Sequence, residues 1–204
     1  VSEANACALV EPGVSYFDLY RHIQDRGLKL MLDVPTPGWG SVIGNALEHG
    51  VGLSPLRDHF AAQCGMEVVL ADGSMLRTGM GAMPNAQTWQ EFKDGIGPYI
   101  DGLFAQSNYG VVTKMGFWLM PEPEAVRGLR VIAARHDDVV PLVALVAELT
   151  YSGVVDSMFQ IRSPVLHGPR DADFEALAAG AGGGAGDAWD EYAQSRGARG
   201  FWNA

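Results

Sequence analysis

The stretch that decides the fold is "GVGLSPLRDHFAAQCGMEVVLADGSMLRTGMGA", residues 50–82. From Met66 to Ala71 successive side chains are expected to point to opposite faces of a sheet, as they do in a strand. Met66, Val68 and Leu70 would share one face, and the residues between them the other. Asp72-Gly73 comes next, and this dipeptide is a strong signal for the tight turn of a hairpin. Residues 74–78 then predict the returning strand. We therefore expect an antiparallel hairpin over residues 66–78.

The residues before this hairpin predict further regular structure. Two segments read as short strands: 5–11 and 28–34. Apolar residues over 16–23 follow the i, i+3, i+4, i+7 spacing of an amphipathic helix. Ser15, with Asp18 three positions later, is a weak variant of the capping box. Gly27 stands where a left-handed residue ends such a helix.

The residues after the hairpin suggest a loop, a long strand and then a boundary. Residues 84–98 read as an irregular loop, and Val111 to Met120 as a strand apolar enough to be buried on both faces. "PEPEAV", residues 121–126, is the best candidate for a domain boundary. Beyond it we expect strands at 129–133 and 157–161, a helix capped by Asp138 and closed by Gly153, a mobile glycine loop at 178–186, and a helix at 189–195.

Composition narrows the class of protein. The 204 residues carry a formal net charge of −10, which repels nucleic acid phosphates and anionic lipid, so neither is expected as a partner. The sequence lacks a run of about 18 uncharged apolar residues that would predict a membrane span. Its first residues lack the basic region of a signal peptide. The chain starts without Met and closes on the strand-like "GARGFWNA", so we expect it to be a piece of a longer protein.

Cysteine and histidine spacing predicts no metal site. Cys7 and Cys64 could pair, but without a C-x-x-C motif two buried, reduced thiols are the expectation. The five histidines contain no i, i+4 pair. Three activity motifs also fail, because Gly directly precedes Ser41 where a serine hydrolase needs G-x-S-x-G, no phosphate-binding P-loop occurs, and "GVGLSP" has only two of the dinucleotide-binding glycines.

Glycine-lined backbone is the remaining candidate for a binding site. Ser41 is placed to cap a short helix over residues 42–49, and the helix start carries these candidates: Gly40, Ser41, Gly44 and Asn45. Free N–H groups and the partial positive charge at a helix N-terminus attract an anion. A capped helix with tight packing is the alternative, and periodicity alone favours it.

Two further candidates have ordinary alternatives as well. Gly65, Met66 and Glu67 begin a strand, where backbone groups often face a ligand, or where they simply pair within a sheet. Asp58 lies between Arg57 and His59 in a turn framed by glycine and proline. It could be a functional carboxylate with a pKa set by a site, or it could cap the following segment or pair with Arg57.

Taken together, three segments resemble one family: "ALVEPGVSYFDLY", "DVPTPGWGSVIGNALEHGVGLSPLRDHFAAQCGMEVVLADGSMLRTGMGA" and "GIGPYIDGLFAQSNYGVVTKMGFWLMPEPE". The family is that of the 4-alkylphenol flavoenzymes, which includes vanillyl-alcohol oxidase, eugenol oxidase and the flavoprotein subunit of 4-cresol dehydrogenase (hydroxylating). The likeness runs from about Ala8 to Pro123 with few gaps, and a weaker likeness continues through "FQIRSPVL" to "GFWNA".

The resemblance implies an α+β fold with FAD as the cofactor. Residues 1–122 would be the second part of an FAD-binding domain of the cresol-methylhydroxylase type, and residues 123–204 the start of an α+β cap domain. The glycines would bring backbone N–H groups to the pyrophosphate and the isoalloxazine. "SNYGVVT" implies further cofactor contacts at Gly110, Val111 and Val112. The flavin itself accepts hydride, so the protein needs no nucleophile of its own.

The resemblance also implies a catalytic carboxylate and a set of partners. The acid near flavin N5 falls on Asp58, which would assist as a 4-alkylphenol loses hydride from its benzylic carbon to give a quinone methide. The family has Tyr-Gly where this chain has Leu56-Arg57, and that departure changes the charge beside Asp58.

The electron acceptor would be a c-type cytochrome or oxygen, the compartment cytoplasm or periplasm, and the complete protein a homo-oligomer. The pyrophosphate loop would precede Val1, and the covalent attachment residue and a Tyr-Arg pair would follow Ala204. A truncated, non-catalytic interaction module is the alternative, because half of an FAD site should bind FAD poorly.

Overall fold

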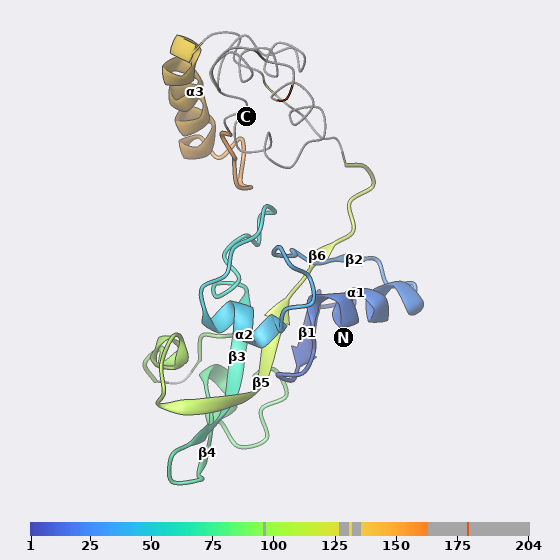
Figure 1. Ribbon diagram of the computed structural model, residues 1–204. Helices are drawn as coiled ribbons and strands as arrows, with labels where there is room; N and C mark the ends of the chain where they lie inside the picture. Colours follow the sequence, from blue (N-terminus) through green and yellow to red (C-terminus); the bar gives the residue numbers. More distant parts are fainter. Residues whose placement is uncertain (96, 127–130, 132–135, 163–178, 180–204) are drawn as a thin grey trace. The chain divides into compact units, whose positions relative to one another are not determined.

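The computed structural model describes residues 1–95, 97–126, 131, 136–162 and 179 (Figure 1). The chain divides into two compact units, Val1–Glu124 and Ala125–Ala204. Each unit is described by itself. None of the helices in the described ranges has the length and apolar character needed to cross a membrane.

The first unit is built on a four-stranded antiparallel sheet in the order β1-β5-β3-β4. Its strands are β1 (Cys7–Val10), β3 (Gln63–Leu70), β4 (Met75–Arg77) and β5 (Gly110–Trp118). The predicted hairpin is confirmed as β3–β4, with Val69 opposite Met75. At its turn Gly73 has a φ of +82°, and the Asp72 carboxylate accepts a hydrogen bond from the Ser74 amide at 2.9 Å.

Two α-helices and a second, two-stranded sheet complete this unit. The helices are α1 (Tyr16–Asp25) and α2 (Val42–Leu47), and the second sheet pairs β2 (Leu30–Met31) with β6 (Met120–Pro121). The capping box of α1 is present, because the Ser15 and Asp18 amides each bond to the other residue's side chain at 3.1 Å. Gly27 has the expected left-handed φ, +62°. Short 3₁₀ helices occur at η1 (Gly79–Ala82) and η2 (Asp101–Phe104).

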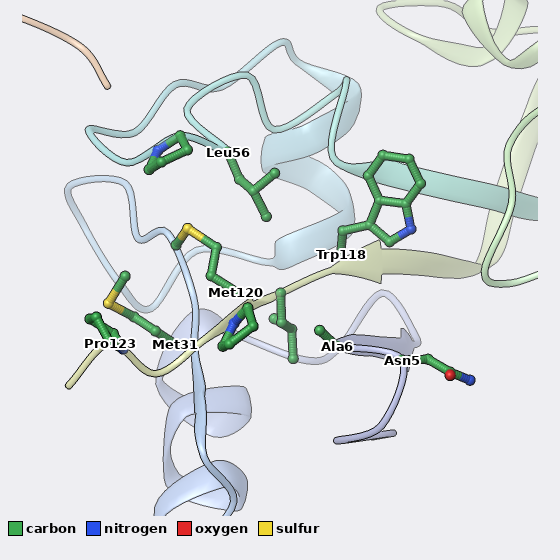
Figure 2. Close-up of a pocket in the computed structure, with 10 residues that line it drawn as sticks. Asn5, Ala6, Met31, Leu56, Trp118, Met120 and Pro123 are labelled. Atoms are coloured by element: carbon green, nitrogen blue, oxygen red, sulfur yellow. The ribbon is translucent and has the colours of Figure 1, made fainter. Parts of the chain in front are cut away.

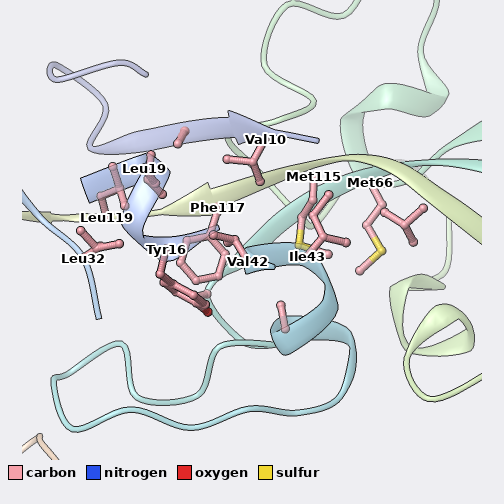
Figure 3. Packing of buried hydrophobic residues seen from close by; sticks show 14 of the residues in the cluster. Val10, Tyr16, Leu19, Leu32, Val42, Ile43, Met66, Met115, Phe117 and Leu119 are labelled. Carbon is pink, nitrogen blue, oxygen red and sulfur yellow. The ribbon is translucent and has the colours of Figure 1, made fainter. Parts of the chain in front are cut away.

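The core of the unit lies where α1 and α2 pack on the sheet (Figure 3). The Tyr16 and Phe117 rings meet edge to face there, with centroids 6.4 Å apart. Both side chains are fully buried, and burial of such a side chain stabilises a fold by roughly 1.5–3 kcal/mol. The expectation that β5 is buried on both faces is wrong at its start, because Val111 is 67% exposed while Val112, Met115 and Phe117 are buried.

The second unit is described in part. It contains η3 (His136–Asp138) and α3 (Val139–Tyr151), and Gly153 follows the helix with a left-handed φ of +71°. Asp138 occupies the predicted cap position, but its side chain makes no capping hydrogen bond. The expected strand at 157–161 is wrong, because those residues are irregular and form no ladder. The elements expected at 129–133, 178–186 and 189–195 lie outside the described residues, except for residues 131 and 179.

Candidate cofactor site

The loop that leads into α2 carries the first group of candidate residues. Ser41 caps α2 as predicted, since its Oγ accepts a hydrogen bond from the Gly44 amide at 3.1 Å. The same Oγ donates to the Pro12 carbonyl at 2.7 Å and ties the loop to the end of β1. Trp39, in this loop, is 73% exposed and lies beside the Phe17 ring. The loop is therefore held at Ser41 and presents an aromatic surface outward.

The amides at the start of α2 are less available to an anion than the sequence suggested. The Val42 amide donates to the Val14 carbonyl at 3.0 Å, and the Gly44 amide donates to Ser41. Gly44 is exposed and Gly40 half-buried, however, and neither is crowded by backbone. A Cβ on Gly40 or Gly44 would meet its nearest non-adjacent atom only at 3.5 Å. A ligand can approach the backbone at these two glycines, and shape rather than free N–H groups would admit it.

Gly65 and Gly110 differ from Gly40 and Gly44, because the protein itself fills the space beside them. A Cβ on Gly65, whose φ is +96°, would lie 2.1 Å from the Trp89 carbonyl oxygen. A Cβ on Gly110 would lie 2.6 Å from Val68 Cγ1. Both positions therefore require glycine for packing within the chain. This contact supports the ordinary alternative at these two positions.

Met66 and Glu67 are used within the sheet as well. Met66 is fully buried, and its amide donates to Thr78 Oγ1 at 2.9 Å. The Glu67 carboxylate lies 2.7 Å from Arg77 Nη2 and 3.3 Å from Lys114 Nζ. Burial raises the pKa of Glu67, but these cations and the Thr113 hydroxyl outweigh it and lower the pKa below its ordinary value. Glu67 is the centre of an ion-pair cluster between β3, β4 and β5.

Candidate residues 65–67 and 110–112 lie on neighbouring strands of the sheet, but the side chains of Val111 and Val112 differ in exposure. Val111 is opposite Val69 and Val112 opposite Val68, next to the segment 65–67. Val111 points to solvent, whereas Val112 is 5% exposed and belongs to the core. Among these strand candidates, Val111 thus offers its side chain to a ligand.

Asp58 lies at a hollow of about 370 Å³ that carries several charged side chains and is called the polar hollow below. The hollow is lined by these residues: His49, Asp58, Phe60, Ala61, Lys93, Asp94 and Tyr99. Asp58 is exposed, and its Oδ1 accepts a hydrogen bond from the Ala61 amide at 2.9 Å, so it caps the turn that follows it. Lys93 also lines the hollow, and its ammonium donates to the Ala61 carbonyl at 2.7 Å. Asp58 thus has the structural role considered for it and also faces a hollow.

The candidate Asn45 is half-buried and forms a cluster with three buried polar side chains that the sequence did not single out: Tyr16, His59 and Asp33. Asn45 Oδ1 accepts from the Tyr16 hydroxyl at 2.9 Å and contacts His59 Nδ1. On the other side of the His59 ring, Nε2 lies 3.8 Å from Asp33 Oδ1. His59 is fully buried and Asp33 is 6% exposed. This cluster joins α1, α2, the residue after β2 and the turn that holds Asp58.

The ionisation of the cluster follows from its surroundings. Burial raises the pKa of Asp33, but the nearby His59 ring and hydrogen bonds from Ser54 and the Leu53 amide outweigh it and lower the pKa to about 2. Burial and the Asp33 charge raise the pKa of Tyr16. Nothing in the local sequence "LDVPTPG" signals this burial, because the groups that satisfy Asp33 follow it by about twenty residues.

A second hollow, of about 640 Å³, is apolar (Figure 2). It is lined by these residues: Asn5, Ala6, Met31, Pro55, Leu56, Trp118, Leu119, Met120, Pro121 and Pro123. The Leu56 side chain points into it, although Leu56 is only two positions from Asp58. The Leu56 departure from the family pattern therefore changes this apolar hollow and not the polar one at Asp58.

The described residues contain no cluster of His, Cys, Asp or Glu that could hold a metal ion. The two cysteines are buried and unpaired, as expected. Burial raises the pKa of both thiols.

Comparison with known proteins identifies the domain. Residues 1–79 match the FAD binding domain family. The chain is 46% identical over 157 residues to the flavoprotein subunit of 4-cresol dehydrogenase [hydroxylating] from Pseudomonas putida, which covers 76% of this chain and 30% of that protein. FAD is the cofactor that these similarities indicate, in agreement with the sequence.

Solved structures also match the whole chain, and they include the following two. The crystal structure of p-cresol methylhydroxylase with substrate bound matches with a TM-score of 0.90 and 38% identity, over 100% of this chain and 40% of that one. The 4-ethylphenol oxidase from Gulosibacter chungangensis in complex with isoeugenol matches with a TM-score of 0.89 and 37% identity, over 100% and 39%. The chain therefore spans well under half the length of these proteins. Its fold matches that of the FAD-binding part of p-cresol methylhydroxylase, and its sequence is similar to those of the 4-cresol dehydrogenase flavoprotein subunit and 4-ethylphenol oxidase.

Proposed function

We propose that this chain supplies one part of the flavin site of an FAD-dependent oxidoreductase that acts on 4-alkylphenols. The observation that supports this is the match over its full length to p-cresol methylhydroxylase with substrate bound, at a TM-score of 0.90. Within the proposal, residues 1–122 belong to the FAD-binding domain and residues 123–204 begin the substrate-covering cap domain. The complete protein would pass electrons to a c-type cytochrome or to oxygen and would form a homo-oligomer.

The described residues fit FAD at some candidate positions and not at others. Gly40 and Gly44 leave the backbone open, and the exposed Trp39 and Val111 side chains offer apolar surface to a flat ring. The backbone at Gly65 and Gly110 is closed by the chain itself. We therefore place the cofactor contacts of this chain at the loop before α2, at Gly44 and at Val111 near the start of β5.

The chemistry is proposed as follows. FAD, when bound, supplies the acceptor at N5 for the hydride that leaves the benzylic carbon as the phenol loses its proton, and water then attacks the resulting quinone methide to give the alcohol. This chain's part is to hold the ring and to place charge beside it. Asp58, at the polar hollow, is proposed as the carboxylate that balances charge during this step. The Lys93 ammonium, fixed on the Ala61 carbonyl, would keep its wall of the hollow in place.

Reduction of the flavin by substrate tests the proposal. The complete open reading frame that contains this chain would be expressed and mixed without oxygen with 4-cresol, vanillyl alcohol or eugenol. A yellow protein bleached by one of these phenols is expected. Folded protein without flavin, or flavin that none of the phenols reduces, would refute the assignment. The colourless outcome would instead favour the non-catalytic interaction module.

A variant pair tests the role of Asp58. Asp58→Ala should retain FAD and slow flavin reduction on the order of 10²–10⁴-fold, the range for a lost acid–base group. Asp25→Asn, at the exposed end of α1, removes one carboxylate from a position remote from the hollow and serves as the control. If Asp58→Ala is reduced as fast as the control, Asp58 is only the cap of its turn.

A further inference from the structure

Asp33 is buried where two segments of the candidate site meet. Its Oδ1 accepts from the Leu53 amide at 3.1 Å. Its Oδ2 accepts from the Ser54 amide at 2.8 Å and from the Ser54 hydroxyl at 2.6 Å. One carboxylate, placed directly after β2, thus binds three donors from residues 53–54. Hydrogen bonds to an ionised acceptor are the stronger kind.

The backbone of the 50–54 segment lies unusually close to this carboxylate. A Cβ on Gly52 would be 1.8 Å from Asp33 Oδ1, and a Cβ on Gly50 would be 2.1 Å from Asn45 Nδ2. Only glycine allows such an approach. Glycines 50 and 52, which the sequence singled out, therefore serve the packing of this segment onto buried polar side chains.

The segment held in this way pairs directly with the residues around Asp58. Val51 forms an antiparallel bridge with Asp58, and the Gly52 amide donates to the Arg57 carbonyl at 2.9 Å. The His59 amide closes the loop on the Gly50 carbonyl at 3.2 Å. Residues 50–59 therefore form one closed loop. Asp58 lies on its second half, and the Asp33 carboxylate binds Leu53 and Ser54 on its first half.

We propose that Asp33 is a positioning residue, whose carboxylate clamps residues 52–54 and thereby sets the place of Asp58 at the polar hollow. Asp33 does not touch that hollow and acts through the loop. Its low pKa keeps the carboxylate ionised at neutral pH, so the clamp retains its charge there. The consequence for flavin chemistry rests on the proposed function, whereas the clamp itself does not.

Amide hydrogen exchange tests the clamp without reference to activity. It would be measured by mass spectrometry on the complete protein as wild type, Asp33→Asn and the Asp25→Asn control. In Asp33→Asn, peptides covering residues 52–58 should exchange about ten to a hundred times faster, as expected when hydrogen bonds to a charged acceptor are lost. Peptides from β3 and β5 should be unchanged. Ser54→Ala, which keeps the carboxylate and removes one donor, should show a smaller effect in the same peptides.

Two results would overturn the clamp. One is unchanged exchange over residues 52–58 in both Asp33→Asn and Ser54→Ala. The other is an equal increase in every peptide, which would mean that Asp33 supports only the stability of the whole domain. Should Asp33→Asn not fold, Ser54→Ala still decides between these outcomes and the proposal.

A double-mutant cycle tests the positioning role in the reaction. Asp33→Asn should slow flavin reduction by substrate about tenfold, and adding it to Asp58→Ala should slow reduction no further, because both changes act through one group. Fully additive effects would show that Asp33 does not act through Asp58 and would overturn this role. A wild-type flavin that phenols do not reduce would refute the proposed function, and the exchange result would still judge the clamp.

Discussion

Replacement of Asp33 by Asn should change the acid stability of the protein in a defined direction. The nearby His59 ring and hydrogen bonds from Ser54 and the Leu53 amide outweigh the effect of burial and lower the pKa of Asp33 from 3.8 to about 2. A drop of this size corresponds to about 2.5 kcal/mol of free energy that favours the folded state when the carboxylate is ionised. Asp33 is 6% exposed, so solvent screens little of this free energy.

The sign follows from the lowered pKa. The stabilisation is fully present above about pH 4, where the carboxylate is ionised in the folded and the unfolded chain, and it is lost as the pH falls through about 2. Tyr16 and His59 are the titratable side chains that the described structure places against Asp33. The difference in the free energy of unfolding between wild type and Asp33→Asn should therefore shrink by about 2.5 kcal/mol between neutral pH and about pH 2.

Urea unfolding of both proteins over this pH range measures the difference. Other carboxylates with lowered pKa values, such as Asp18 and Asp72, are present in both proteins, so their contributions cancel. The Asp25→Asn control should show no comparable change with pH. A difference that stays constant down to about pH 2, or that grows in acid, would refute the assignment of the low pKa to the Asp33 clamp.

Three substitutions test how the candidate residues divide between packing and cofactor binding. Gly65→Ala forces a Cβ to 2.1 Å from the Trp89 carbonyl at a φ of +96° and should destabilise the fold by about 3 kcal/mol or more; an unchanged urea midpoint would contradict this packing role. Gly44→Ala, at an exposed position of α2 where a Cβ would make only ordinary contact, should raise the stability of the FAD-free protein by roughly 0.5–1 kcal/mol and weaken FAD binding, and an unchanged FAD dissociation constant would remove Gly44 from the site. Glu67→Gln leaves two cations without their partner and should cost about 2 kcal/mol of stability without weakening FAD binding; a raised FAD dissociation constant would return Glu67 to the site.

The local elements of the fold could be predicted because their causes lie within a few residues. Ser15 and Asp18 cap α1 across three positions, and Gly27 ends it. In the β3–β4 turn the Asp72 carboxylate accepts a hydrogen bond from the amide of Ser74, two residues later, and Gly73 adopts a positive φ. The family and its cofactor also followed from the sequence, since residue order and spacing carry them.

Distant contacts set the limits of that reasoning. Residues 157–161 were expected to form a strand, but a strand needs a partner that local composition does not reveal. The long apolar run in β5 suggested burial on both faces, yet Val111 is exposed while the adjacent Val112 is buried, so only one face of the sheet is covered at these two residues. In both cases the neighbours, and not the residues themselves, decided the outcome.

By itself the sequence determined the helix caps, the hairpin turn, the FAD-binding family and the presence of glycine at each crowded position. Only the tertiary structure decided what each glycine is for: Gly65 makes room for the Trp89 carbonyl, and Gly52 for the Asp33 carboxylate, whereas a Cβ on Gly44 would make only ordinary contact. It also decided that Asp33 is buried and that Asp58 is exposed. The physical reason is that burial and close approach depend on atoms some twenty residues away in the chain, which no local pattern records.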